Sequence, residues 1–302
     1  MVKVDLITGF LGSGKTTFIK KYARYLMEQG QNIGILENDF GAINVDMMLL
    51  RELEMVAGGC DKDCYRRRFK TKLIAMGMCG YDRVLIEPSG IFDVDDFFDA
   101  LHEEPLDRWY QIGNVITVVD ASLEKTLSKE ADYVLASEVA NAGCVLLSKT
   151  QDASEEEIRQ TVAHLNRALQ EIHCSRVLKD EVICKDWEDF TEKEFKKILE
   201  SGYLVEDYEK LYVDQDEIFQ TLFFMDEKIA VSKAKHAAKK IFADPACGGV
   251  LRVKGFLQDG KNWLELNATQ HEISLKPIGA GQDVLIIIGE KLNEEKIRYY
   301  LE

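Results

Sequence analysis

Residues 9–16 of the chain read Gly-Phe-Leu-Gly-Ser-Gly-Lys-Thr, a complete GxxxxGK[ST] phosphate-binding loop. The apolar run Val2–Thr8 precedes the loop, and Thr17–Leu26, with apolar residues at helical spacing, follows it. A phosphate loop works only when a buried strand leads into it and a helix begins from it, and both conditions are met. The stretch therefore predicts a strand, a loop and a helix that bind a nucleoside triphosphate.

The residue types of this loop match the chemistry of a polyphosphate. Glycines let the backbone wrap closely around the ligand and turn N–H groups toward it, and the helix N-terminus adds its positive dipole end. Lys15 is expected to neutralise the β- and γ-phosphates during catalysis, and the Thr16 hydroxyl to hold Mg²⁺. The loop residues predicted to contact the nucleotide are Gly9, Gly12, Ser13, Gly14, Lys15, Thr16 and Thr17.

Length and composition favour an acidic protein of two domains. The chain has 302 residues, of which 46% are hydrophobic, and this is enough for two cores. Its net charge of −15 disfavours a nucleic acid as the principal partner. We find no run of the roughly 18 apolar residues that a membrane span needs and no signal-peptide pattern, so we expect no membrane partner and a cytoplasmic location. The seven cysteines would then be thiols or metal ligands.

The alternation of short apolar strands with helical patterns over residues 1–204 predicts an α/β fold of the P-loop NTPase class, with a mostly parallel sheet flanked by helices. The predicted strands are Val4–Ile7, Ile33–Leu36, Val84–Ile86, Asn114–Val119, Cys144–Leu147 and Ile172–Val177. Residues 205–214 resemble an acidic linker, and residues 215–302 predict a smaller α+β domain with an antiparallel sheet. Ligands of the first domain should bind at the carboxyl ends of its strands.

A second element of the nucleotide site, Glu87-Pro88-Ser89-Gly90, follows a predicted strand. Glu87 is predicted to hold Mg²⁺ directly or through water, and the Gly90 N–H to sense the γ-phosphate. The alternative is a strand that simply ends in a turn. The phosphate loop elsewhere in the chain favours the first interpretation.

A third element, Glu37-Asn38-Asp39-Phe40-Gly41, also lies just past a strand end. Its carboxylates could order around Mg²⁺ and the γ-phosphate and relax on hydrolysis, as in a switch loop. Glu37 or Asp39 would orient the attacking water, and the sequence does not decide between them. A solvated acidic turn is the alternative.

Together these motifs resemble the CobW-type family of metal-chaperone GTPases, which includes CobW-like proteins of cobalamin synthesis and is related to the urease and hydrogenase maturation GTPases. The matching segments are Gly9–Thr17, Glu37–Gly41, Gly58–Cys60, Glu87–Gly90 and Val118–Ala121, with Gly249–Phe256 and Ile287–Gly289 similar to the family's C-terminal domain. The resemblance implies GTP hydrolysis coupled to delivery of a transition metal, such as Zn²⁺ or Co²⁺, to a client protein.

The cysteine motif departs from the family pattern. The family usually carries Cys-x-Cys-Cys after Gly-Gly, whereas residues 58–64 read Gly-Gly-Cys-Asp-Lys-Asp-Cys. If Cys60 to Cys64 is helical, the two sulfurs share a face and could bind a transition metal with Glu37 or Asp63. If the segment is a loop, the geometry stays open, and two ordinary thiols are the alternative.

The base-reading loop departs as well. The usual guanine motif is Asn-Lys-x-Asp, in which the lysine packs over the base and the aspartate accepts two hydrogen bonds from it. Here Ser148-Lys149-Thr150-Gln151 follows a predicted strand, so Ser148, Lys149 and Gln151 are the base-contacting candidates. Gln151 offers one acceptor together with its own donors, which matches guanine less well. Binding of ATP in addition to GTP therefore stays open.

Three functions remain as hypotheses. The leading one is a Mg²⁺-dependent nucleoside triphosphatase, with GTP as nucleotide, that acts as a switch in delivering a metal or metallocofactor to a client metalloprotein. A small-molecule kinase would need an arginine-bearing lid, and we find no clear segment for one. A nucleotide-sensing scaffold would bind nucleotide without turnover. Whether the chain forms a homodimer is left open.

Overall fold

The computed structural model describes residues 1–37, 62–88, 94–123, 127–210, 219–225, 229–260, 262–279, 281 and 283–302. Within these ranges, the side chains of residues 37, 62–66 and 68 are not described. By its internal contacts the chain divides into two compact units, and the described residues of the first end at Lys210 while those of the second begin at Phe219. The predicted linker at residues 205–214 stays a prediction, because part of it lies outside the described ranges.

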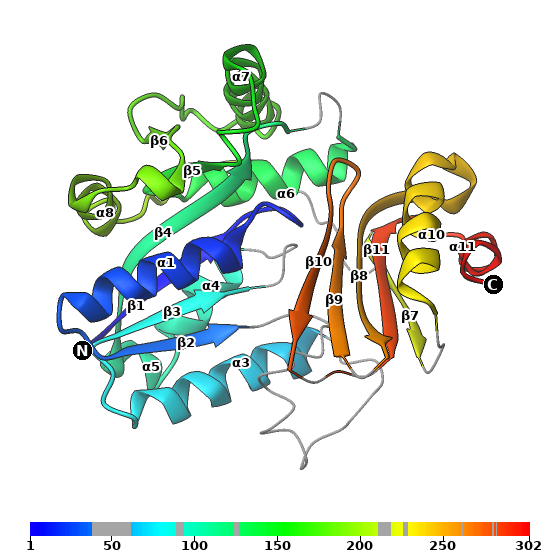
Figure 1. Cartoon of the computed structure of the whole chain (residues 1–302). Helices are drawn as coiled ribbons and strands as arrows, with labels where there is room; N and C mark the ends of the chain where they lie inside the picture. The colour runs from blue at the N-terminus through cyan, green and yellow to red at the C-terminus, as the bar shows by residue number, and fades with distance from the viewer. Residues whose placement is uncertain are drawn as a thin grey trace. The chain divides into compact units, whose positions relative to one another are not determined.

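The first unit is built on a six-stranded sheet in the order β2-β3-β1-β4-β5-β6, in which all neighbours are parallel (Figure 1). Its strands are β1 (Val2–Thr8), β2 (Ile33–Glu37), β3 (Arg83–Glu87), β4 (Tyr110–Asp120), β5 (Cys144–Ser148) and β6 (Val182–Ile183). The predicted α/β fold with a mostly parallel sheet is thus confirmed. In such a sheet every strand presents its carboxyl end to the same edge.

Helices cover both faces of this sheet. They are α1 (Lys15–Glu28), α3 (Lys62–Gly77), α4 (Val94–His102), α5 (Leu106–Trp109), α6 (Lys129–Ala140), α7 (Glu155–Glu171) and α8 (Glu192–Leu199) (Figure 1). The consecutive residues Val84, Leu85 and Ile86 of β3 are all fully buried, although successive side chains of a strand point to opposite faces. No helix in the described ranges is long and apolar enough to cross a membrane.

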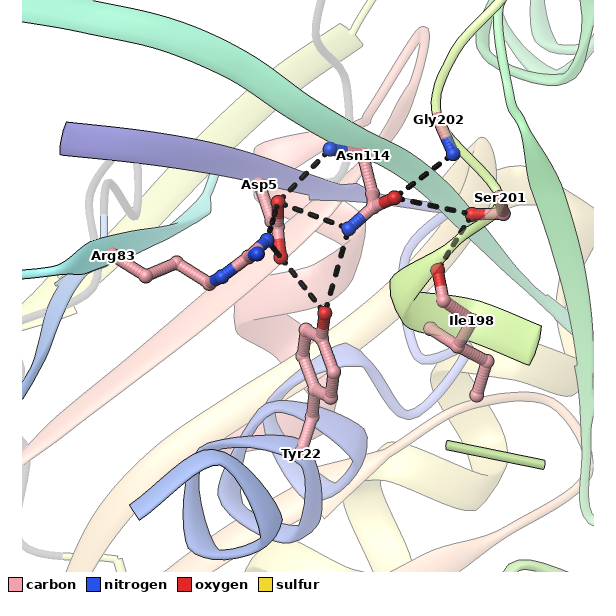
Figure 2. A network of polar contacts seen from close by, with 7 residues as sticks. All are labelled: Asp5, Tyr22, Arg83, Asn114, Ile198, Ser201 and Gly202. Carbon is pink, nitrogen blue, oxygen red and sulfur yellow. Dashed lines mark hydrogen bonds and ion pairs between the residues drawn. The ribbon is translucent and has the colours of Figure 1, made fainter. Parts of the chain in front are cut away.

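A network of buried polar side chains ties the first unit together around Asp5, in the middle of β1 (Figure 2). The Asp5 carboxylate accepts hydrogen bonds from Arg83 at 2.5 and 2.6 Å, from the Tyr22 hydroxyl at 2.9 Å, and from the backbone and side-chain nitrogens of Asn114 at 2.9 and 3.1 Å. The Asn114 side-chain oxygen in turn accepts from the Gly202 N–H at 2.9 Å. One carboxylate thus links strands β1, β3 and β4 with helix α1.

The prediction of a strand at Ile172–Val177 is wrong. Ile172 is the C-cap of α7, and the sixth strand is the two-residue β6, Val182–Ile183. Ile172 and Cys174 of the segment are buried and serve packing, whereas Val177 is exposed. The Arg176 side chain donates to the Val139 and Ala140 carbonyls at the end of α6, so it packs against a helix end.

Residues 203–210 have no helix or paired strand beyond one isolated bridge, and they lie along the first unit. Leu204 N–H donates to the Asn141 carbonyl at 3.0 Å, and Glu209 N–H donates to the Ile172 carbonyl at 2.9 Å. Lys210 pairs with Asp95 of α4. The part of the predicted linker that the structure describes is therefore attached to the first unit.

The second unit is an antiparallel sheet in the order β10-β9-β8-β11-β7 (Figure 1). Its strands are β7 (Phe219–Met225), β8 (Gly249–Asp259), β9 (Asn262–Ala268), β10 (Ile273–Ile278) and β11 (Val284–Glu290), and its α-helices are α10 (Val231–Ala243) and α11 (Glu294–Leu301). Ala238 and Ile241 of α10 and Ile297 of α11 pack with Val253 and Ile287 of the sheet in one core. The predicted α+β class with an antiparallel sheet is confirmed.

Candidate functional site

The phosphate loop joins the carboxyl end of β1 to the N-terminus of α1, as predicted. Its glycines have positive φ angles, 139° at Gly9, 78° at Gly12 and 98° at Gly14, in a region that favours glycine. Gly9 also lies so close to β4 that a Cβ there would come within 2.1 Å of the Val118 carbonyl oxygen. The loop therefore needs glycine for its conformation and for its contact with the sheet.

Lys15 folds back over this loop. Its ammonium donates hydrogen bonds to the Gly9 carbonyl at 2.6 Å and to the Phe10 carbonyl at 3.3 Å, and only 6% of the residue is exposed. The N-terminus of α1 has no side-chain cap, because Gly14 occupies the N-cap position, and the first turn has no acidic residue. The first N–H groups of the helix thus face the loop together with a cation, an arrangement suited to an anion.

The two residues predicted to hold Mg²⁺ meet at the same edge of the sheet. The Thr16 hydroxyl at the start of α1 donates a hydrogen bond to the Glu87 carboxylate at the end of β3, with a distance of 2.8 Å. Mg²⁺ prefers oxygen ligands and often takes only one or two from the protein. A hydroxyl and a carboxylate oxygen beside a phosphate loop fit that ion in kind and number.

Glu37 ends the strand next to Glu87. β2 and β3 pair in parallel, and Glu37 and Glu87 are Cα partners in the register. The backbone therefore places a second acidic residue beside the candidate Mg²⁺ ligand, although the side chain of Glu37 lies outside the description.

The candidate base loop begins at the end of β5. The Ser148 hydroxyl donates to the Val119 carbonyl at 3.3 Å, and Lys149, with a φ of 54°, pairs with Asp120 at 2.8 Å. The side-chain nitrogen of Gln151 donates to the neighbouring Asp152 carboxylate at 2.9 Å. Lys149 is thus oriented by the carboxylate that ends β4, and the Gln151 amide has a local partner on the surface.

Trp187, which the sequence analysis did not place in the site, lies between the phosphate loop and the base loop. Its ring comes within 3.4 Å of the position that a Cβ on Gly14 would take, and the Ser148 Cβ comes within 3.6 Å of the same position. The ring packs edge-on against Phe18 of α1, with 5.6 Å between centroids. Its indole N–H is buried and has no hydrogen-bond partner in the described part of the chain. Trp187 closely follows β6. Had the sequence analysis placed the sixth strand at β6, it could have predicted Trp187 at the carboxyl edge of the sheet, where the site lies.

Glu138 of α6 is the second residue that the sequence analysis missed. It is 0% exposed, and neither carboxylate oxygen has a hydrogen-bond partner among the residues that the structure describes. Burial raises the pKa of the Glu138 carboxyl to about 8, while the nearby Lys15 ammonium and Gly9 N–H lower it in part. The available signal is an acidic residue within an otherwise neutral helical stretch, Tyr133–Ala140.

A model of the CobW/HypB/UreG nucleotide-binding domain matches residues 3–176 of the chain. This is more than half of the 302 residues. The chain belongs to the CobW/HypB/UreG family. The matched range contains the phosphate loop, both candidate Mg²⁺ ligands and the base loop of this family member.

Curated relatives of this CobW/HypB/UreG protein are named as zinc proteins. The zinc chaperone YjiA of Escherichia coli is 30% identical over 181 residues, which cover 55% of each chain. The zinc chaperone YeiR of the same organism is 31% identical over 138 residues, covering 43% of this chain and 42% of YeiR. The zinc-regulated GTPase metalloprotein activator 1 of Dictyostelium discoideum is 23% identical over 303 residues, covering 84% and 62%. The chain spans about half the length of the curated relatives it matches.

Solved structures of family members show a likeness as well. The Zn(II)-bound YjiA GTPase of E. coli is 21% identical, with coverage of 100% of this chain and 99% of that chain and a TM-score of 0.41. The hydrogenase maturation factor HypB of Archaeoglobus fulgidus is 18% identical, with coverage of 62% and 81% and a TM-score of 0.34.

Several predicted site residues of this family member lie outside the described residues. These are Asp39, Cys60 and Gly90, together with the side chains of Glu37 and Cys64. Helix α3 begins at Lys62, so Cys64 lies in its first turn. Elsewhere in the described ranges, no group of three or more His, Cys, Asp or Glu residues is placed to hold a metal ion. The predicted transition-metal site therefore stays a prediction.

Proposed function

We propose that this CobW/HypB/UreG-family chain is a Mg²⁺-dependent GTPase that acts as a switch in the delivery of a transition metal, with zinc as the first candidate, to a client protein. The observation that carries the proposal is the meeting of the loop lysine Lys15, the hydroxyl of Thr16 and the carboxylate of Glu87 at one edge of the sheet. The zinc-chaperone names of YjiA and YeiR support the choice of cargo, and the name of the zinc-regulated GTPase of Dictyostelium discoideum supports the choice of GTP.

The phosphate end of the site binds and neutralises charge. The loop N–H groups and the N-terminus of α1 receive the phosphates, and Lys15 would exchange its loop carbonyls for the β- and γ-phosphate oxygens. Thr16 and Glu87 would hold Mg²⁺, and the Gly90 N–H would sense the γ-phosphate. The ion supplies neutralisation of the charge that develops on the phosphate oxygens. Glu37 or Asp39 would orient the attacking water.

The base end of the site would contact the nucleotide through Ser148, Lys149 and Gln151. Lys149 is oriented by its ion pair with Asp120 and can cover one face of a base. Because Gln151 carries an amide where two carboxylate acceptors would suit guanine, we propose a preference for GTP over ATP that is smaller than in a GTPase with aspartate at this position.

The cargo end would bind the transition metal through Cys60, Cys64 and Glu37. Thiolates are strong ligands for Zn²⁺, and a carboxylate can complete the set. Glu37 ends the strand paired with that of Glu87, so a metal bound by Glu37 would lie next to the proposed Mg²⁺ ligand. This proximity supports a coupling between nucleotide state and metal affinity.

Hydrolysis of GTP and ATP by the purified chain with Mg²⁺ tests the nucleotide part of the proposal. We expect slow GTP hydrolysis that Lys15→Ala or Thr16→Ala reduces at least about 100-fold, because each removes charge stabilisation at the phosphates. Lys20→Ala on the exposed face of α1 is the matched control and should retain activity. Phosphoryl transfer to a metabolite would instead show a kinase, and tight binding without turnover, even with metal and client present, would show a scaffold.

Titration with Zn²⁺ and Co²⁺ in the presence of GDP or a non-hydrolysable GTP analogue tests the cargo part. We expect the double variant Cys60→Ala/Cys64→Ala to lose most metal affinity, whereas Cys184→Ala, which removes an exposed thiol, should not. The cargo assignment fails if both cysteines can be lost without effect and the nucleotide affinity does not respond to metal.

A further inference from the structure

Glu138 is held directly behind the phosphate loop. Its backbone carbonyl accepts a hydrogen bond from the Thr117 hydroxyl at 2.9 Å, and that hydroxyl also contacts the Thr8 hydroxyl at 3.0 Å. Thr8 is the last residue of β1 and is followed by Gly9. The last residue of β1 and Thr117 of β4 therefore link this turn of α6 to the start of the loop.

The carboxyl of Glu138 faces a neutral environment apart from one cation. Among the described residues, the ammonium of Lys15 is the charge that acts on it, and the Gly9 N–H is the nearby dipole. The side chains that β1 and β4 contribute at this point are the hydroxyls of Thr8 and Thr117, which carry no charge. An ionised carboxylate is costly in such a place, and the Lys15 ammonium, followed by the Gly9 N–H, offsets only part of that cost.

A bound nucleotide changes both the position of the Lys15 ammonium and the charges that surround Glu138. The phosphates draw the Lys15 ammonium away from the loop carbonyls and bring several negative charges to the other side of the loop. An ionised Glu138 would lose part of its attraction to Lys15 and would also be repelled by the phosphates. Both effects favour the neutral acid, because like charges and burial each disfavour the charged form.

We propose that Glu138 is a positioning residue for Lys15, and that its carboxylate takes up one proton from solvent when a nucleoside di- or triphosphate binds to the loop. Neutral Glu138 releases Lys15 to the phosphates, whereas ionised Glu138 competes with them for the same ammonium. The inference rests on the proposed nucleotide site. By linkage, conditions that protonate Glu138 raise the nucleotide affinity by the same factor by which the nucleotide favours protonation.

The pH range of the proton uptake follows from the ionisation of Glu138 in the nucleotide-free protein. Because burial raises the pKa of Glu138 to about 8, the carboxyl of the nucleotide-free chain is largely neutral at lower pH and largely ionised above that value. Proton uptake is therefore expected to be large at about pH 8.5 and small at about pH 6.5.

Calorimetric titration of the full chain with GDP and Mg²⁺ at about pH 8.5, in two buffers of different ionisation enthalpy, measures this uptake. We expect the wild type to take up roughly 0.5 to 1 proton per GDP, and Glu138→Gln to take up none. Glu138→Gln should also bind GDP about 3- to 10-fold more tightly than the wild type at this pH, with the difference vanishing near about pH 6.5. Glu130→Gln, earlier on the same helix, is the matched control and should behave as the wild type.

Two results would overturn the inference alone: GDP binding to the wild type without proton uptake, or equal uptake by Glu138→Gln. If GDP does not bind to the wild type at all, the proposed nucleotide site fails and the inference fails with it. Should Glu138→Gln not fold, the uptake and the pH profile of the wild type decide, with Glu138→Asp, which keeps a carboxyl, expected to retain the uptake.

Discussion

Asp5 and Glu138 are both 0% exposed in the same unit of the protein, yet their hydrogen bonding differs. Asp5 accepts hydrogen bonds from Arg83, Tyr22 and Asn114 (Figure 2). Neither oxygen of Glu138 accepts a hydrogen bond in the described part of the chain. One buried carboxylate is completely paired, and the other lies behind a loop that is built for an anion.

The comparison separates a group that holds the fold from a group that responds to a ligand. Removing one charged member of a paired buried set leaves the charge of its partner without compensation, so such a set is difficult to change. A carboxyl without hydrogen bonds costs stability when ionised, and a fold retains such a cost more readily at a functional site than elsewhere. Four predictions test this distinction.

The largest effect is expected for Asp5→Ala. Arg83 is only 3% exposed, and without Asp5 its charge would be buried alone. We expect the free energy of unfolding to fall by about 3–5 kcal/mol, measured by urea denaturation near neutral pH. Asp99→Ala, which removes an exposed carboxylate of α4, is the control and should change stability by less than about 0.5 kcal/mol. A loss below about 1 kcal/mol for Asp5→Ala would contradict a structural role for the network.

Glu138→Gln is expected to change stability in the opposite direction to Asp5→Ala, by a pH-dependent gain in the free energy of unfolding. The pKa of Glu138 is raised by burial from 4.5 to about 8, so the folded state binds the extra proton between these values. The wild type therefore loses stability as the pH rises through this window, and the loss is complete above it. Relative to the wild type, the variant should gain on the order of 2–4 kcal/mol at about pH 8.5 compared with about pH 5. Unfolding free energies that differ by a constant amount at all pH values would show that Glu138 does not titrate in this range.

Tyr22→Phe probes one donor of the paired set. Burial and the negative charge of Asp5 raise the pKa of Tyr22, so the hydroxyl stays a neutral donor. Its removal costs a charge-assisted hydrogen bond, but Arg83 and Asn114 still compensate Asp5. We expect a loss of about 1.5 kcal/mol in urea denaturation, and almost none for Tyr299→Phe, an exposed residue of α11. A loss as large as that of Asp5→Ala would mean that the donors act as one cooperative unit.

The smallest effect is expected for Trp187→Phe. The indole N–H has no hydrogen-bond partner in the described residues, so its deletion removes packing area but no hydrogen bond. The stability should fall by less than about 1.5 kcal/mol, whereas the change in tryptophan fluorescence on addition of GDP should be lost. Trp263→Phe in the second unit is the control and should retain that change. A persistent fluorescence response in Trp187→Phe would place the reporter elsewhere.

The local sequence pattern, which is the order of apolar and glycine residues along the chain, predicted those parts of the site that lie within one strand-loop-helix unit. The phosphate loop, the strand before it and the helix after it follow from contiguous residues, and they are present at Val2–Glu28. The ends of β2 and β3 were also predicted, which brought Glu37 and Glu87 to one edge because parallel strands share their direction. The pattern gave a wrong strand at Ile172–Val177, where Ile172 and Cys174 are buried at the end of α7 and no strand forms.

The sequence by itself determined that this chain has a phosphate loop on a parallel sheet, because backbone geometry and hydrophobic periodicity act over a few residues. Only the tertiary structure decided that Asp5 is fully paired, that Glu138 is not, and that Trp187 lies at the loop. The partners of Asp5 are 17 to 109 residues away along the chain. Such distances are closed by packing of the whole sheet and its helices, and burial then converts an ordinary carboxyl into either a structural pair or a proton-sensitive neighbour of the phosphates.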